Sequence, residues 1–134
     1  IVNSYDNTLY YTDYILSKVV DELKPYEKDF GTAMFYISDH GESLGENGLF
    51  LHGSPYAIAS DYQKEVPMMT WFANSFVEDH HMDLNCLNNK AMSQRFSQDN
   101  FFHSLLGILD VNTSFYDEKM DLFSKCRVWN RTER

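Results

Sequence analysis

The feature that most constrains the fold is an apolar, strand-like run at residues 33–37 that leads directly into a glycine-rich loop. Asp39 and His40 stand side by side just after this run, and His52 follows twelve residues after His40. Glycines let the backbone turn sharply, so the loop can bring His52 back to the end of the strand. One carboxylate and two imidazoles form a ligand set that Zn²⁺ accepts. The pattern therefore predicts a strand that ends at a divalent metal site.

Hydrophobic periodicity predicts the remaining elements and an α/β fold class. Apolar residues recur at three- and four-residue steps along residues 4–23 and 99–109, which indicates two helices. Residues 32–37 and 66–73 are rich in β-branched and aromatic side chains, which indicates two strands, the first of them buried. The glycine-punctuated segment 38–64 is predicted to be a functional loop. In open α/β sheets, ligands bind at the carboxyl ends of strands, and this is where Asp39 and His40 fall.

Two further segments have weaker patterns. Residues 74–89 are polar and are predicted to be irregular, with His80 and His81 in a solvated loop. The tail from Phe115 to Trp129 is predicted to hold a short strand or a helical turn. His103 lies among the apolar residues of the second helix, where a core histidine is the simpler interpretation than a metal ligand.

Charge and composition exclude two classes of function. The chain has 134 residues, 43% of them hydrophobic, which suffices for a globular core. Its formal net charge of −9 does not favour nucleic acid, whose recognition needs a basic surface. A run of about 18 apolar residues, as needed to span a bilayer, is absent from the sequence.

The two cysteines leave two possibilities open. Cys86 and Cys126 lie 40 residues apart and lack the C-x-x-C spacing of a metal or redox pair. They can form a disulfide in an oxidising compartment, or they can be two free buried thiols.

The loop after the first strand carries a long and specific string, Tyr36-Ile37-Ser38-Asp39-His40-Gly41-Glu42-Ser43-Leu44-Gly45-Glu46-Asn47-Gly48, which Leu51-His52-Gly53 and Pro55-Tyr56 continue. This string closely resembles the lipid A phosphoethanolamine transferases, a family that includes the mobile colistin-resistance enzymes. The family belongs to the alkaline phosphatase and sulfatase superfamily. Residues 5–14, 66–71 and 97–111 resemble further segments of the same family.

The resemblance implies part of an α/β/α sandwich and a set of roles for the loop residues. Asp39 and His40 are expected to ligate a catalytic zinc ion. His52 is expected to act in catalysis and in substrate binding, by contacting the transferred phosphoethanolamine group or a second zinc ion. Glu42 and Glu46 are expected to organise the loop around the metal ligands. Enzymes of this family use a threonine nucleophile to move phosphoethanolamine from phosphatidylethanolamine to a phosphate of lipid A.

The chain departs from the family because the threonine nucleophile and further zinc ligands lie upstream and have no matching positions here. Residues 1–134 are therefore expected to be the C-terminal segment of a catalytic domain on the periplasmic side of the bacterial inner membrane. The upstream catalytic half and an N-terminal membrane domain are expected to be missing, and the isolated chain to be inactive and to self-associate. The periplasmic setting implied by the resemblance favours a Cys86–Cys126 disulfide.

Two alternatives remain open at this level. One is a sulfatase, or a phosphoglycerol transferase or hydrolase, of the same superfamily. The other is an inert fragment that binds metal. A threonine nucleophile in the parent protein would favour the transferase, whereas a cysteine in a sulfatase signature would favour ester hydrolysis.

Overall fold

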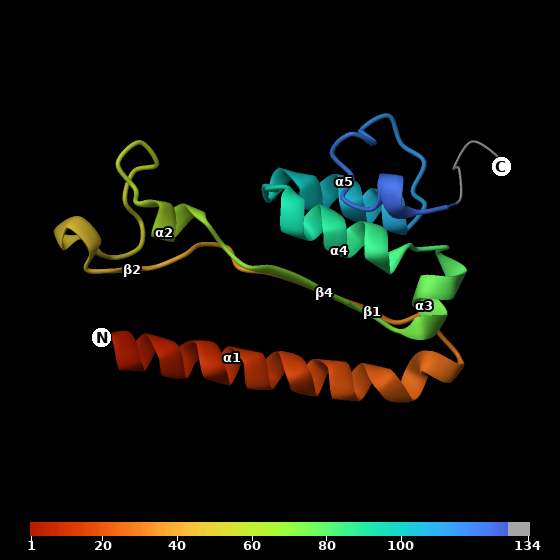
Figure 1. The fold of residues 1–134 in the computed structure, drawn as a ribbon, viewed down its shortest axis with the longest axis horizontal. Coiled ribbons are helices and arrows are strands. Elements are labelled where there is room, and N and C mark those ends of the chain that lie inside the picture. The colour runs from red at the N-terminus through yellow and green to blue at the C-terminus, as the bar shows by residue number, and fades with distance from the viewer. Residues whose placement is uncertain (129–134) are drawn as a thin grey trace. The chain divides into compact units, whose positions relative to one another are not determined.

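The structure, a computed structural model, describes residues 1–128, and these form two compact units (Figure 1). Unit 1 comprises residues 1–26 and 32–72, and unit 2 comprises residues 27–31 and the chain from residue 73 onward. The structure contains both helices and strands, which agrees with the predicted α/β class.

Unit 1 begins with helix α1, Val2–Leu23, which confirms the helix predicted at residues 4–23. The chain then tightens into a 3₁₀ turn at Lys24–Lys28, because Pro25 has no N–H with which to continue the α-helical hydrogen bonds. Helix α1 contacts strand β1 (Ala33–Ile37), yet none of its side chains is fully buried. Tyr10 and Tyr11 are among its exposed apolar residues. Self-association of the chain through such surfaces stays a prediction.

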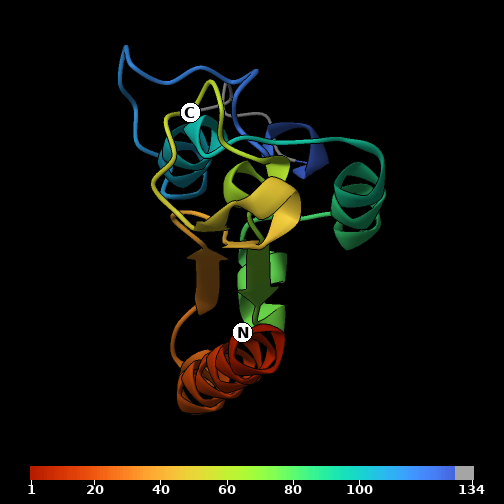
Figure 2. The same ribbon diagram turned by 90° about the vertical axis from the view of Figure 1, so that its left-hand side faces the viewer.

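The sheet of unit 1 pairs β1 with β4, Met68–Phe72. Figure 2 shows the two strands running in opposite directions, and the register joins Ala33 to Phe72 and Ile37 to Met68. Both predicted strands are thus confirmed, and Pro67 precedes β4, where its missing N–H costs no ladder bond. The expected full burial of the first strand is wrong: all five residues of β1 are half-buried. Within residues 1–128 the sheet has only these two strands, so each has an unpaired edge.

The segment between the two strands is more regular than the predicted loop. Strand β2, Ser43–Leu44, pairs antiparallel with β3, Phe50–Leu51, across a 3₁₀ turn at Glu46–Gly48. The short helix α2, Asp61–Lys64, precedes β4.

Unit 2 is helical, with α3 at Asn74–Asp79, α4 at Leu84–Ser93 and α5 at Asp99–Ile108. Helix α5 confirms the second predicted helix. The irregular structure predicted for residues 74–89 is wrong, because Asp83 accepts hydrogen bonds from the backbone N–H groups of Asn85 and Cys86 and so caps α4.

The tail of unit 2 contains a 3₁₀ turn at Ser124–Cys126, which agrees with the predicted helical turn; Trp129 lies outside the described residues.

His80 stacks on Phe76, with ring centroids 4.1 Å apart, and burial is the main cause that lowers its pKa. His103 is half-buried and accepts a hydrogen bond of 3.0 Å from the backbone N–H of Asp117, as suits a structural histidine.

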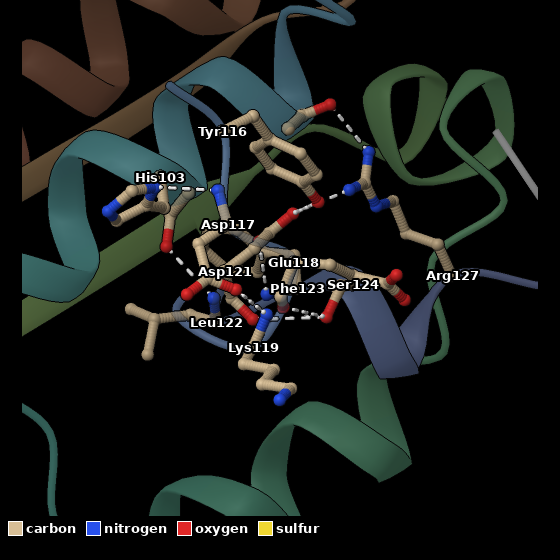
Figure 3. A network of polar contacts seen from close by, with 12 residues as sticks. His103, Tyr116, Asp117, Glu118, Lys119, Asp121, Leu122, Phe123, Ser124 and Arg127 are labelled. Atoms are coloured by element: carbon tan, nitrogen blue, oxygen red, sulfur yellow. Dashed lines mark hydrogen bonds and ion pairs between the residues drawn. The ribbon is translucent and has the colours of Figure 1, made fainter. Parts of the chain in front are cut away.

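The core of unit 2 surrounds a buried carboxylate, Asp121, which is drawn with its partners in Figure 3. Its oxygens accept hydrogen bonds from the Tyr116 hydroxyl (2.8 Å), the Phe123 backbone N–H (2.8 Å) and the Arg127 guanidinium (2.7 Å). Arg127 also donates to the Gly107 carbonyl oxygen. These hydrogen bonds offset the free-energy cost of burying the charge of Asp121.

A disulfide joins Cys86 on α4 to Cys126 in the 3₁₀ turn, in agreement with the pairing that the family resemblance favours. Helix α4 also contacts this turn directly. Among residues 1–128, no helix combines the length and apolarity needed to cross a membrane.

We expect the double variant Cys86→Ser, Cys126→Ser to unfold at a lower temperature than the oxidised chain. Closing a loop of 40 residues restricts the unfolded chain, and this constraint is worth about 4 kcal/mol in the loop-entropy treatment. Thermal unfolding followed by circular dichroism measures the difference. Reduction of the unmodified chain should reproduce the loss, whereas a reductant should not change the melting temperature of the double variant. Equal melting temperatures for all forms would contradict a stabilising disulfide.

Candidate metal site

The backbone turns sharply where β1 ends, and three hydrogen bonds fix the turn. The Ser38 N–H donates to the Pro67 carbonyl oxygen (3.2 Å), and the Ser38 hydroxyl donates to the His40 carbonyl oxygen (2.9 Å). The Gly41 N–H donates to the Gln63 carbonyl oxygen (3.0 Å). Residues 38–41 are therefore attached to the segment that leads into β4.

This turn determines which nitrogen of His40 is available. Nδ1 lies 3.0 Å from the Gly41 carbonyl oxygen, and because a carbonyl oxygen only accepts, Nδ1 must carry the proton. Nε2 keeps its lone pair and lies 3.9 Å from Oδ2 of Asp39. The other oxygen of Asp39 accepts from the His40 backbone N–H at 3.1 Å.

The β2–β3 hairpin places His52 beside Glu42. Its register pairs Ser43 with Leu51, so the residues just outside this pair, Glu42 and His52, lie opposite each other. Nδ1 of His52 lies 3.0 Å from Oε2 of Glu42. Since the carboxylate accepts, Nδ1 is again the donor, and in the neutral ring Nε2 carries the lone pair.

His40, Glu42 and His52 form one cluster that offers three ligand atoms within 4.8 Å of one another. The two imidazole rings stack with centroids 4.0 Å apart. Oε1 of Glu42 is buried and has no hydrogen-bond partner in the part of the chain that the structure describes. A buried carboxylate oxygen without a partner is costly, and a cation bound there would remove that cost. Two imidazoles and one carboxylate are ligands that zinc prefers, so the residues present fit a divalent metal.

The structure brings together two of the three predicted site residues, His40 and His52, and adds Glu42 to them. The carboxylate of Asp39 neighbours the His40 ring but is 88% exposed, and it stands outside the three-residue cluster. Its role as a metal ligand stays a prediction. The sequence suggested Glu42 only as a supporting group, because its place in the cluster depends on the pairing of two strands of two residues each.

Gln63 on helix α2 forms hydrogen bonds with residues at both ends of the β2–β3 hairpin. Its side chain is buried, and its amide nitrogen donates to the Ser43 hydroxyl at 2.9 Å. Its amide oxygen accepts from the Ser54 backbone N–H at 3.3 Å. The buried Ser43 hydroxyl also pairs with the Ser60 hydroxyl at 2.7 Å. These contacts hold the two ends of the hairpin, and therefore Glu42 and His52, in place.

Comparisons with known proteins identify the family of the chain. The chain matches the Sulfatase family over residues 1–111. It is 50% identical over 127 residues to phosphoethanolamine transferase EptA of Escherichia coli (strain K12), a match that covers 95% of this chain and 23% of the relative. It is 49% identical over 75 residues to phosphatidylethanolamine transferase Mcr-2 of Escherichia coli, which covers 56% of this chain and 14% of that protein.

Two solved structures share the fold. One is the integral membrane protein lipooligosaccharide phosphoethanolamine transferase A (EptA) from Neisseria meningitidis, with a TM-score of 0.91 and 42% identity over 95% of this chain and 24% of that one. The other is the C-terminal periplasmic domain of phosphoethanolamine transferase EptC from Campylobacter jejuni, with a TM-score of 0.80 and 43% identity over 97% of this chain and 40% of that one.

The chain belongs to the sulfatase family, as the resemblance predicted, and its close homologues are enzymes named phosphoethanolamine transferases. The predicted fold class is confirmed by the same structures. The chain spans about a quarter of the length of the curated EptA relatives that it matches.

We expect Gly41→Ala to lower the free energy of unfolding by about 2–3 kcal/mol, in the upper range for overpacking. A Cβ at this position would collide with the Tyr62 carbonyl oxygen, and backbone cannot move aside as a side chain can. Gly48→Ala is the matched control: nothing lies near its Cβ, and only the positive φ of 74° opposes it, at a cost of about 1–2 kcal/mol. Urea unfolding of both variants measures the difference. A smaller loss for Gly41→Ala than for Gly48→Ala would contradict the close approach.

Proposed function

We propose that this chain is the metal-binding part of a zinc-dependent transferase that moves phosphoethanolamine from phosphatidylethanolamine to a phosphate of lipid A. The observation that carries the proposal is the cluster of His40, Glu42 and His52, with its unpartnered carboxylate oxygen, inside the part of the chain that matches the Sulfatase family. We place the parent protein in the bacterial inner membrane with this segment in the periplasm, because the related EptA is described as an integral membrane protein and the related EptC domain as periplasmic.

The residues that would hold the zinc ion are His40 and Glu42, with Asp39 as the further ligand that the sequence predicts. Zinc bound there would supply a Lewis acid that offsets negative charge on phosphoryl oxygens. His40 is oriented for this role because the Gly41 carbonyl oxygen fixes its Nδ1–H and leaves Nε2 as the donor atom.

His52 would act on the transferred group. Its Nδ1–H donates to Glu42, so its Nε2 can accept a proton from an attacking hydroxyl or return one to a leaving oxygen. Glu42 lies in the same relation to His52 as a carboxylate that orients a catalytic imidazole, because it fixes the tautomer and stabilises the imidazolium form. The threonine nucleophile would come from a part of the parent protein outside this chain, so we propose that the isolated chain is inactive.

The alternative within the family is hydrolysis of a sulfate ester, in line with the family's description. The names of the close relatives favour phosphoethanolamine transfer instead, because both EptA proteins and EptC are named phosphoethanolamine transferases.

We expect zinc to bind the 134-residue chain and to bind about 10–100-fold more weakly after Asp39→Ala, His40→Ala or Glu42→Gln. The last change keeps the size of the side chain but removes its charge. Calorimetric titration with zinc measures the affinity. Asp61→Ala is the control, because Asp61 is an exposed carboxylate of the same unit that pairs only with Lys64 among the contacts described. Unchanged affinity in all three variants would contradict the proposed ligands.

We expect the full-length parent enzyme to lose at least about 100-fold in transfer rate after His40→Ala or His52→Ala, since removal of a metal ligand or an acid–base group has effects of this size. The assay supplies phosphatidylethanolamine and lipid A and follows modified lipid A by mass spectrometry. The same assay on the isolated chain should give no product. Product from the isolated chain would mean that it contains its own nucleophile, and full activity after His40→Ala would place the metal elsewhere.

A further inference from the structure

All lysines between residues 73 and 128 of this acidic chain line one small cavity in unit 2. They are Lys90 on α4 and Lys119 and Lys125 in the tail. The cavity has a volume of about 120 Å³, which is room for a few water molecules or one tetrahedral oxyanion. Lys119 and Lys125 follow Lys90 by 29 and 35 residues in the sequence, so the fold rather than local sequence brings the three lysines to the cavity.

The carboxylate that lines the cavity is already paired with other groups. Asp121 lines the cavity, but its side chain is fully buried, and its oxygens are occupied by Tyr116, the Phe123 N–H and Arg127. Lys119 and Lys125 are exposed and form no ion pair within residues 1–128. Figure 3 shows the side chain of Lys119 extending away from the Asp121 network.

The lysines of unit 1 behave differently. Lys18 and Lys24 both pair with Asp21, at 3.2 and 3.3 Å, and Lys64 pairs with Asp61 at 3.1 Å. In a chain with 20 acidic residues and 11 lysines and arginines, an available carboxylate is the usual partner of a lysine. The lysines of the cavity are therefore a local excess of positive charge on a negative chain.

The positively charged lysines of the cavity also repel one another. Lys90 donates to the Leu122 carbonyl oxygen at 2.7 Å, which holds its ammonium at the wall. Burial lowers the pKa of Lys90; Asp121 opposes this effect and the ammonium of Lys125 adds to it. An anion bound among these lysines would relieve this repulsion. The negative charge of the rest of the chain repels such an anion little, because charges are screened beyond about 8–10 Å at physiological salt.

We infer that the cavity formed by Lys90, Lys119 and Lys125 is a binding site for a phosphate-type oxyanion. Lysine binds phosphate as a point charge. A divalent oxyanion balances three ammonium groups better than a single carboxylate does. The hydroxyl of Ser124 and the amide of Gln94 also line the cavity. The phosphate can belong to a free small molecule or to a lipid headgroup at a membrane surface. This inference does not depend on the proposed transferase activity.

The test uses the 134-residue chain and the double variant Lys119→Ala, Lys125→Ala, in which the wall contact of Lys90 is left intact. The matched control, called the α1 control, is Lys18→Ala, Lys24→Ala, which removes the same charge from helix α1 and from the 3₁₀ turn that follows it. In one arm, inorganic phosphate is titrated at constant ionic strength set with sodium chloride, and binding is followed by nuclear magnetic resonance shifts of residues 119–125. In the other arm, cosedimentation is measured with vesicles of phosphatidylcholine and phosphatidic acid, against vesicles of phosphatidylcholine alone.

We expect phosphate to shift the resonances of the unmodified chain and of the α1 control, and to bind about tenfold more weakly to the cavity variant. If only the mixed vesicles bind, and the cavity variant alone loses this binding, the site takes a lipid phosphate. Absence of binding in both arms would overturn the inference. Equal losses in the two double variants would also overturn it, because they would show a response to net charge rather than to the cavity.

Discussion

The backbone pairing of β2 with β3 is the interaction on which the candidate metal site depends. Neither Glu42 nor His52 belongs to a long element, and ten residues separate them in the sequence. They meet because Ser43 pairs with Leu51 and Leu44 with Phe50. A shift of this register by one residue would move His52 away from Glu42 and turn its side chain to the other face. The buried amide of Gln63 and the hydroxyl of Ser43 oppose such a shift, because they would lose their hydrogen bonds in the buried base of the hairpin.

How much of the structure could be predicted follows from the length and pattern of each element. Helices α1 and α5 have apolar residues at helical spacing, and β1 and β4 are continuous apolar runs, so the sequence predicts all four. Helix α4 has no comparable stripe, since its middle is Leu87-Asn88-Asn89-Lys90. It forms because Asp83 caps its first turn and the Cys86 disulfide anchors it, and neither effect appears in periodicity.

The candidate metal site could likewise be predicted only in part. Asp39, His40 and His52 stand out because they follow a strand and are flanked by glycines. Glu42 does not stand out, because its part in the cluster depends on the pairing of two strands of two residues each, too short to leave an alternating pattern. The lysine cavity could not be predicted from the sequence, because tertiary packing brings its residues together from separate segments.

Asp121 and Glu42 show how the hydrogen bonds of a carboxylate distinguish a structural role from a ligand-binding role. Asp121 in unit 2 is fully buried and each of its oxygens has a donor, so it needs nothing further and stabilises the tail. Glu42 in unit 1 is less buried, yet one of its oxygens is shielded from solvent and has no donor within the described residues. Removing the charge of Asp121 would leave Arg127 without its carboxylate partner, which is a cost to folding. Replacing Glu42 by glutamine instead keeps an acceptor for the Nδ1–H of His52 but removes the charge from the oxygen that has no donor, so the affinity for a cation falls. A carboxylate with one buried oxygen that has no donor, beside two imidazoles, is therefore better explained by what it binds than by what it stabilises.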